Sequence, residues 1–171
     1  GAKIWNKTIC ETKKTNPDTT IEVLIPDFQG MESSLDLVIE AKPEIVSHNI
    51  ETVERLTPQV RNKAIYQRSL EVLHYLKTSG MKVKSGIMTG LGETIEEIYK
   101  TMDDLLDAGC EILTIGQYLQ PTRQQLEVVK YYTPEEFEKM KETGLSKGFK
   151  IVESAPLVRS SFHAEKHLID N

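Results

Sequence analysis

Cysteine is scarce in this sequence, which holds only Cys10 and Cys110 among its 171 residues. Two cysteines so far apart do not form the paired framework of a disulfide-rich secreted protein. We therefore expect an intracellular, reduced setting for the chain.

An excess of positive charge is also absent. Lys and Arg total 21 against 26 Asp and Glu, a formal net charge of −5, and the basic residues form no cluster. This balance argues against nucleic acid, and against an anionic membrane surface, as the main partner. No run of apolar residues approaches the length of a transmembrane helix.

The chain further lacks an N-terminal Met, a signal peptide and a helix cap at its start. Its first residues, Gly1-Ala2-Lys3-Ile4-Trp5, run directly into a helical pattern. We expect that the chain begins in the middle of a longer protein, so the missing targeting segment carries little weight.

The composition is otherwise that of an ordinary globular protein, with 39% apolar and 27% charged residues and no repeats. A chain of 171 residues can bury a real core. We predict a single domain with a core over about residues 1–150 and a C-terminal tail over about residues 151–171.

Helical and strand patterns alternate along the chain. Apolar spacing and capping residues predict helices near residues 4–14, 35–39, 70–76, 94–109 and 133–148. Runs of β-branched and apolar residues predict strands near residues 20–25, 45–47, 83–88, 112–115 and 151–152. Such alternation is typical of right-handed βαβ units around a parallel sheet. The predicted fold class is α/β, a partial barrel of about four or five parallel strands.

The other motifs are arranged around the stretch K-S-G-I-M-T-G-L-G-E-T, residues 84–94. A buried strand ends there, Gly90 and Gly92 interrupt it, and Thr94 starts a helix. Glycines allow a positive φ and a close approach of the backbone to a ligand. Glu93 lies where the strand gives way to the helix, the edge at which α/β enzymes bind their ligands.

Polar residues follow four of the predicted strands. Because the carboxyl ends of parallel strands meet at one rim, these segments predict a binding site there. The four segments cover residues 26–30, 48–52, 90–93 and 117–122.

Several of these residues have two interpretations. In one interpretation, the amide of Asn49 and the carboxylate of Glu51 bind a diol such as ribose. In the other, Asn49 is the N-cap of a helix and Glu51 is an acidic residue in its first turn. His48 is interpreted as a hydrogen-bonded structural histidine. Lys84 is interpreted as a surface lysine flanking the strand, and the alternative is the Schiff-base lysine of a small barrel lyase.

The tail is unusually rich in functional side chains for a C-terminal end. An apolar run over residues 155–158 leads into Arg159, two serines, Phe162 and His163. The alternative to a functional tail is a docked strand followed by a polar coil.

Five segments, in this order and at these spacings, resemble the lipoyl synthase family of radical S-adenosylmethionine enzymes. They are I-P-D-F-Q-G (25–30), H-N-I-E-T-V (48–53), K-S-G-I-M-T-G-L-G-E-T (84–94), G-Q-Y-L-Q-P-T (116–122) and A-P-L-V-R-S-S-F-H-A (155–164). The resemblance covers the whole chain. It implies a partial (β/α)6 barrel of the TIM type in the intact protein.

The resemblance also implies two [4Fe-4S] clusters and S-adenosylmethionine as cofactors. Family members hold the clusters in C-x3-C-x2-C and C-x4-C-x5-C motifs, and the second cluster is consumed as the sulfur source. Neither motif occurs here, and two cysteines cannot supply the thiolates of even one four-cysteine cluster. By this resemblance the chain is the C-terminal part of the enzyme, without the first two strands, and is inactive alone.

Site residues follow from the resemblance position by position. Gly86, Gly90 and Glu93 match G-x-I-x-G-x-x-E, with Met88 in the Ile place, in the segment that shapes the nucleoside pocket. Asn49 and Glu51 fall where the family contacts the ribose and methionine parts.

The later motifs add further residues. Gln117 to Gln120 lie beside the adenine, and Ser161 matches the serine ligand of the auxiliary cluster, with Arg159 nearby. Phe162 replaces the usual tyrosine, and Gln125, where many members have histidine, is given no role. No residue of the chain is assigned a catalytic role.

The family reaction inserts sulfur at C6 and C8 of an octanoyl chain. The implied partners are an octanoylated lipoyl-carrier domain, from a 2-oxoacid dehydrogenase E2 or the glycine cleavage H protein, and an iron–sulfur carrier protein. The implied location is the cytoplasm in bacteria, or a mitochondrion or plastid in eukaryotes. The alternative from another class is a non-catalytic module that binds S-adenosylmethionine or an acyl-carrier partner.

Overall fold

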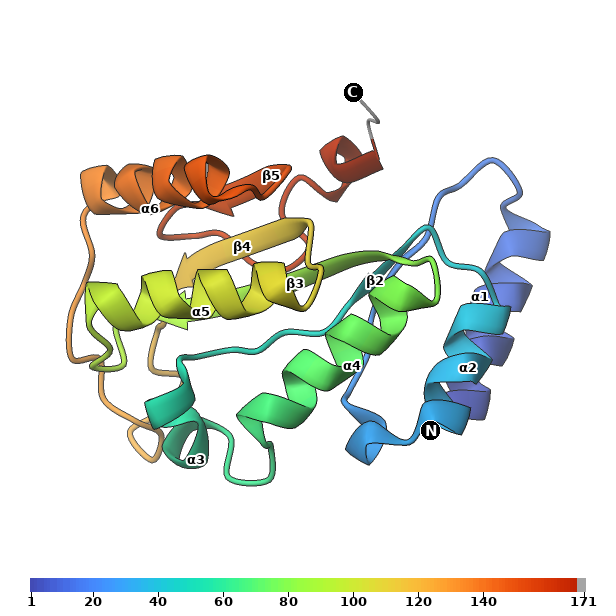
Figure 1. The fold of residues 1–171 in the computed structure, drawn as a ribbon, viewed down its shortest axis with the longest axis horizontal. Helices are drawn as coiled ribbons and strands as arrows, with labels where there is room; N and C mark the ends of the chain where they lie inside the picture. The colour runs from blue at the N-terminus through green and yellow to red at the C-terminus, as the bar shows by residue number, and fades with distance from the viewer. Residues whose placement is uncertain (169–171) are drawn as a thin grey trace.

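A single parallel sheet organises the protein in the computed structural model, which describes residues 1–168 (Figure 1). Its five strands follow one another in the order of the chain, each paired in parallel with the next. They are β1 (Glu22–Leu24), β2 (Ile45–Ser47), β3 (Lys82–Thr89), β4 (Ile112–Gln117) and β5 (Ile151–Ser154).

Helices connect consecutive strands. The α-helices are α1 (Ala2–Thr15), α2 (Glu32–Glu40), α3 (Thr57–Val60), α4 (Tyr66–Thr78), α5 (Ile95–Asp107) and α6 (Pro134–Lys147). Short 3-10 turns add η1 (Phe28–Gly30), η2 (Glu54–Leu56) and η3 (Ala164–Leu168). No helix in residues 1–168 combines the length and the apolar character needed to cross a membrane.

The sequential strand order identifies the architecture as an arc of a barrel. In a doubly wound sheet the order reverses at a switch point, whereas successive right-handed βα units that never reverse build the wall of a barrel. The α/β partial-barrel prediction is confirmed, including the short strand β5.

The main core lies between the outer face of the sheet and the helices. In α5 the residues Ile98, Met102 and Leu105 are completely buried, and Leu113 and Ile115 of β4 belong to the same apolar cluster. The predicted capping box starts this helix: the Thr94 hydroxyl accepts a hydrogen bond from the Glu97 backbone nitrogen at 3.3 Å.

The opposite face, here called the inner face, carries a different set of side chains. Lys84 and Gly86 of β3 and Thr114 and Gly116 of β4 lie on it, two residues apart along each strand. The C-terminal tail crosses this face, and Val158 is buried there. The inner face therefore combines polar groups with glycines beneath a covering segment.

The two consecutive turns η2 and α3 were not predicted from the sequence. Leu56 and Thr57 are buried within them. A helix of four residues is too short to show a helical period, so sequence patterning carries no signal for it.

Candidate functional site

The loop after β3 is shaped by its own glutamate. Glu93 is only 8% exposed, and its two carboxylate oxygens accept hydrogen bonds from the backbone nitrogens of Gly90 at 2.6 Å and Leu91 at 2.9 Å. Burial, and next the charge of the nearby Glu93 carboxylate, raises the pKa of Tyr132. Glu93 thus holds the glycine loop in a fixed shape.

Gly90 is required at its position for two reasons. Its φ of +105° disfavours any side chain, and a Cβ there would collide with the Gln117 amide and the Lys130 carbonyl. The Gln117 side chain donates to the Tyr118 and Lys130 carbonyls, both at 3.0 Å, and accepts from the Tyr132 nitrogen at 3.0 Å. Gln117 therefore fastens the segment at residues 130–132 over the loop.

Asn49 presents an unsatisfied acceptor to the inner face. Its Oδ1 atom is buried and has no hydrogen-bond partner among the described residues. A Cβ on Gly86 would lie 3.0 Å from this oxygen and 2.5 Å from Thr114 Oγ1, so only glycine leaves the space between them open. A buried acceptor without a donor is costly, and a ligand donor would satisfy it.

Glu51 lies beside Asn49 in a strained backbone position. It forms an isolated parallel bridge with Ile87 and has a φ of 68°, rare for a residue with a side chain. Burial raises the pKa of the Glu51 carboxyl, although a hydrogen bond from Asn49 and the charge of Arg61 partly offset this.

The alternative interpretation of Asn49 and Glu51 as a helix start is wrong. The next helical turn, η2, begins at Glu54 after Val53, and no helix of the described chain starts at residues 49–51. The segment instead leaves β2 and turns at Glu51, where the Thr52 nitrogen donates to the Ile50 carbonyl at 2.9 Å.

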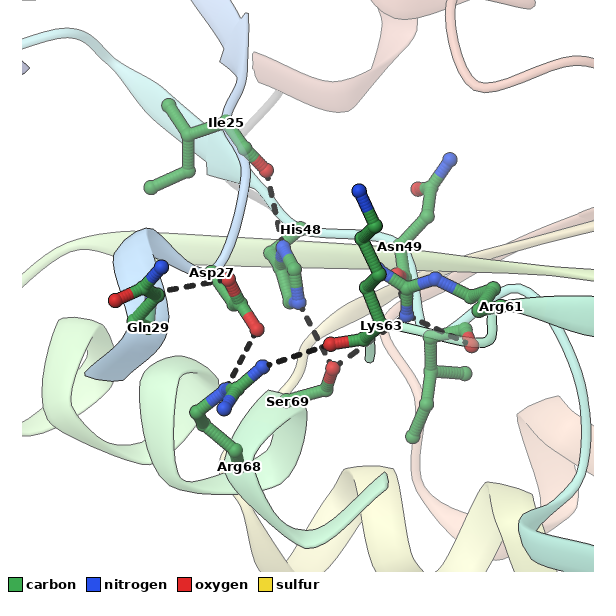
Figure 2. A network of polar contacts seen from close by, with 10 residues as sticks. Ile25, Asp27, Gln29, His48, Asn49, Arg61, Lys63, Arg68 and Ser69 are labelled. Atoms are coloured by element: carbon green, nitrogen blue, oxygen red, sulfur yellow. Dashed lines mark hydrogen bonds and ion pairs between the residues drawn. The ribbon is translucent and has the colours of Figure 1, made fainter. Parts of the chain in front are cut away.

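A polar network beneath this segment fixes its course (Figure 2). The ring nitrogens of His48 lie 3.0 Å from the Ile25 carbonyl and 3.0 Å from Ser69 Oγ, and burial lowers the pKa of His48. The guanidinium of Arg61 donates to the carbonyls of Asn49 at 3.2 Å and Ile50 at 3.3 Å. Figure 2 shows the Asn49 side chain pointing away from this network. The interpretation of His48 as a structural histidine is confirmed.

The loop after β1 is held by an ion pair. Asp27 accepts from Arg68 Nε at 2.6 Å and from the Gln29 nitrogen at 3.0 Å. Although burial by itself raises the pKa of Asp27, these hydrogen bonds outweigh it, so the net shift is downward. Asp27 thus anchors the loop to α4 and is not free to bind a ligand.

The tail residues lie on the inner-face side of the sheet. Gly116 has no side chain, which lets the Val158 carbonyl and the Arg159 guanidinium approach β4. Arg159 and Ser161 are exposed, and Arg159 Nη1 donates to the Val158 carbonyl at 2.6 Å. The structure brings Asn49, Glu51 and Gly86 together, while Gln117 and Glu93 act through the loop beside them.

The interpretation of Lys84 as a surface lysine is wrong, because its side chain is completely buried. Its Nζ atom forms an ion pair with Glu22 at 2.7 Å and also donates to the Ser160 carbonyl. The sequence pattern was misleading because a lysine between apolar strand residues marks a strand edge more often than a covered face.

Arg61, Thr114 and the segment at residues 128–132 were not singled out from the sequence. Arg61 acts only through backbone carbonyls, and the Val129 nitrogen donates to the Gly90 carbonyl at 2.8 Å. Contacts to backbone atoms depend on the tertiary structure, so the pattern of side chains along the sequence does not predict them.

Residues 1–168 contain no group of three or more His, Cys, Asp and Glu side chains placed to hold a metal ion. Cys10 lies on α1, whereas Cys110 is buried beside β4, where burial raises the pKa of its thiol to about 12. Two thiols are too few for an iron–sulfur cluster, which takes three or four cysteine ligands.

Comparison with known families identifies the class. The sequence profile of the Radical SAM superfamily matches residues 3–105, so the chain belongs to that superfamily. The domain of pyruvate-formate lyase-activating enzyme from Bacteroides vulgatus superposes with a TM-score of 0.64 at 9% identity, covering 88% of this chain and 90% of that one. Streptococcus suis SuiB bound to S-adenosylmethionine superposes with a TM-score of 0.69 at 11% sequence identity. The superposition covers 97% of this chain and 39% of the SuiB chain.

Within the superfamily, the chain is similar to proteins named lipoyl synthase. The protein from Bacteroides fragilis (strain YCH46) is 61% identical over 168 residues, 98% of this chain. The one from Flavobacterium johnsoniae is 56% identical over 170 residues, 99% of this chain. The chain spans 58% and 59% of the lengths of these two relatives.

The site residues fit S-adenosylmethionine, the cofactor of this superfamily. The unpartnered Oδ1 of Asn49 and the neighbouring Glu51 carboxylate are acceptors, and the ligand brings ribose hydroxyls and an ammonium group as donors. The open space at Gly86 lies beside the Asn49 acceptor. For the clusters, the described residues offer no comparable set of ligands.

Proposed function

We propose that this chain functions as part of a lipoyl synthase, which inserts sulfur at C6 and C8 of a protein-bound octanoyl group. The observation that carries the proposal is the 61% identity to a named lipoyl synthase over 98% of the chain. The cluster cysteines are supplied from outside these 171 residues.

In this proposal the cofactor lies over Asn49, Glu51 and Gly86. Asn49 and Glu51 accept hydrogen bonds from its ribose and methionine parts, and Gly86 leaves room for it. Glu93, Gly90 and Gln117 hold the glycine loop that closes the pocket. The support is the unpartnered Asn49 oxygen beside a glycine that tolerates no side chain.

The tail has a separate role. Ser161 provides an oxygen ligand to the auxiliary cluster, and Arg159 lies beside it. Both side chains are exposed on the tail that crosses the inner face, which leaves them accessible to a group bound there.

When bound and given one electron by the first [4Fe-4S] cluster, S-adenosylmethionine would release methionine and supply the 5′-deoxyadenosyl radical that abstracts hydrogen from the octanoyl chain, and the second, auxiliary [4Fe-4S] cluster would supply the sulfur. The chain's own residues bind the cofactor, orient it and exclude water. The partners are an octanoylated carrier domain, from a 2-oxoacid dehydrogenase E2 or the glycine cleavage H protein, and an iron–sulfur carrier protein. The location is the cytoplasm of a bacterium.

The test uses the protein supplied with the two cysteine motifs and reconstituted without oxygen. Incubation with S-adenosylmethionine, a reductant and an octanoylated carrier domain should give the lipoyl form by mass spectrometry. Asn49→Leu should abolish the product, while Asn6→Leu, on α1, should leave it unchanged. Binding of S-adenosylmethionine without any product after full reconstitution would favour a non-catalytic binding module instead.

A further inference from the structure

A buried ionic cluster on the inner face has no role in the proposed cofactor site. Lys84 is 0% exposed, and its ammonium group contacts three partners. It donates to Glu22 Oε1 at 2.7 Å and to the Ser160 backbone carbonyl, and it lies 3.2 Å from His167 Nδ1. His167 is also fully buried, with Nδ1 3.7 Å from the second oxygen of Glu22.

Stability alone does not account for a lysine at this position. Burying an ammonium group costs free energy that an ion pair offsets only in part, and a well-packed apolar residue of similar size commonly does as well or better. Across the sheet Lys84 pairs with Ile112 of β4, which is buried and apolar, and with Ser47 of β2, which is buried and small, so a methionine would be compatible with the surroundings. The distinctive property of Lys84 is that it can bind a carbonyl oxygen.

The partners of Lys84 come from the two ends of the chain. Glu22 lies on β1, whereas Ser160 and His167 belong to the tail. Lys84 therefore fastens the tail to a strand in the middle of the sheet, and Glu22 holds the lysine in place from the edge strand.

The attachment point on the tail lies between two exposed residues. Val158 is seated against Gly116, and a turn follows in which the Phe162 nitrogen donates to the Arg159 carbonyl at 2.9 Å. Ser160 is half-buried in this turn, with Arg159 and Ser161 exposed on either side of it. Fixing the Ser160 carbonyl therefore fixes the direction of both neighbouring side chains.

We propose that Lys84 is a positioning residue of the tail: together with Glu22 it binds the Ser160 carbonyl and so places Ser161 and Arg159 over the inner face. The anchoring stands on the contacts above, and its consequence for a cluster ligand rests on the proposed function. Lys84 itself acts only through the tail.

Hydrogen exchange of this chain tests the anchoring directly. Because Lys84→Met alone leaves the Glu22 carboxylate without its partner, the main variant is Lys84→Met with Glu22→Gln. We expect the Phe162 and Ala164 amides, whose acceptors lie in the same turn, to exchange about tenfold faster, while β4 and α5 keep the parent rate. Lys84→Arg, which retains a cationic donor, should recover most of the protection.

A matched control removes another ion pair, Lys13–Glu44 at 2.6 Å, by Lys13→Met with Glu44→Gln. That pair joins α1 to the residues before β2, so the tail should keep its parent exchange rate. Unchanged exchange of the tail in the Lys84 and Glu22 double variant would overturn the anchoring. An equal acceleration in the tail, β4 and α5 would overturn it as well, because Lys84 would then be only a core residue.

The consequence for ligation is tested in the protein supplied with the cysteine motifs. The Mössbauer spectrum of the auxiliary cluster in the double variant should match that of Ser161→Ala, with the affinity for S-adenosylmethionine as in the parent. A parent-like spectrum would overturn the positioning role even if stability fell. Absence of lipoyl product from the parent would instead refute the proposed function and leave the exchange result standing.

Discussion

Oε1 of Glu93 lies 2.6 Å from the backbone nitrogen of Gly90, three residues earlier in the loop that follows β3. The second oxygen is occupied by the Leu91 nitrogen at 2.9 Å. Both oxygens of this carboxylate are therefore engaged by the loop. Any influence of Glu93 on a bound cofactor has to pass through the shape of the loop.

Glu93→Ala should lower the free energy of unfolding by about 1–3 kcal/mol, because two buried backbone donors lose their acceptor. Urea denaturation of the isolated chain measures this loss. Glu96→Ala, at an exposed position in the first turn of α5, is the control and should change stability by no more than about 1 kcal/mol. Equal losses in the two variants would show that the buried hydrogen bonds contribute little.

Gly90→Ala should destabilise the chain more than Gly80→Ala does. Both glycines have positive φ, +105° and +86°, so an alanine at either position carries backbone strain of about 1–2 kcal/mol. At Gly90 the added methyl also meets Gln117 and Lys130, which adds about 1–3 kcal/mol of overpacking. At Gly80 nothing lies within 4 Å of the added Cβ, so comparing the two thermal melts isolates the collision.

Glu51→Gln should separate stability from cofactor binding. Burial raises the pKa of Glu51 in the folded state, so the folded protein binds more protons than the unfolded chain through the carboxyl range. The parent therefore loses stability as the pH rises through that range. The variant should be the more stable at neutral pH, and this advantage should shrink as the pH falls toward about 4 and be lost below it.

Affinity should respond in the opposite way. With the cysteine motifs supplied, Glu51→Gln should weaken S-adenosylmethionine binding by about 1–3 kcal/mol, as for a lost hydrogen bond to a charged acceptor. Calorimetric titration beside thermal melts at several pH values measures both effects. Unchanged affinity would remove Glu51 from the proposed cofactor site.

The two thiols should differ sharply in reactivity. Cys110 is buried and its pKa is raised to about 12, so almost none of it is thiolate at pH 8, whereas Cys10 is only partly buried. Ellman's reagent should therefore titrate one thiol in the native chain and two in urea. Cys10→Ser should abolish the native reaction, and a rapid reaction of Cys110 in the native state would contradict the burial.

Ser161→Ala should separate cluster assembly from sulfur transfer in the protein supplied with the cysteine motifs. A serine oxygen is a harder and weaker ligand for iron than a thiolate, which suits an iron that has to leave during turnover. We expect the alanine variant to assemble the auxiliary cluster and form little lipoyl product, and Ser161→Cys to lose cluster iron more slowly. Ser160→Ala is the control, because Lys84 uses only the Ser160 backbone. If the Ser161→Ala variant transfers sulfur fully, Ser161 is not a cluster ligand, and the tail is only a segment that packs against the sheet.

The order and type of the main elements could be predicted from the sequence because local patterns determine them. The capping boxes at Thr94 and Thr133 place two helix starts, and Gly109, with φ of 85°, follows the end of α5. The polar segments after the strands correctly pointed to one rim, where Asn49 and Glu51 lie together.

The contacts within the site could not be predicted in the same way. Lys84 pairs with Glu22, 62 residues earlier, and with the tail, so its burial depends on tertiary structure. Gln117 and Arg61 hydrogen-bond to backbone groups, and those groups are brought near them only by the tertiary structure. The sequence pattern predicts which face of a helix or strand is apolar. It does not predict which backbone atoms come into contact at that face.

The Lys84 contacts also have a consequence for synthesis on the ribosome. Consecutive strand order allows each βα unit to pack on the one before it as the chain emerges, with Glu22 and Lys84 already in place. The Ser160 carbonyl emerges after both of them, so until then the lysine faces water on an open sheet. In the growing chain, the contact that covers the inner face therefore forms only after the strands beneath it have been synthesised.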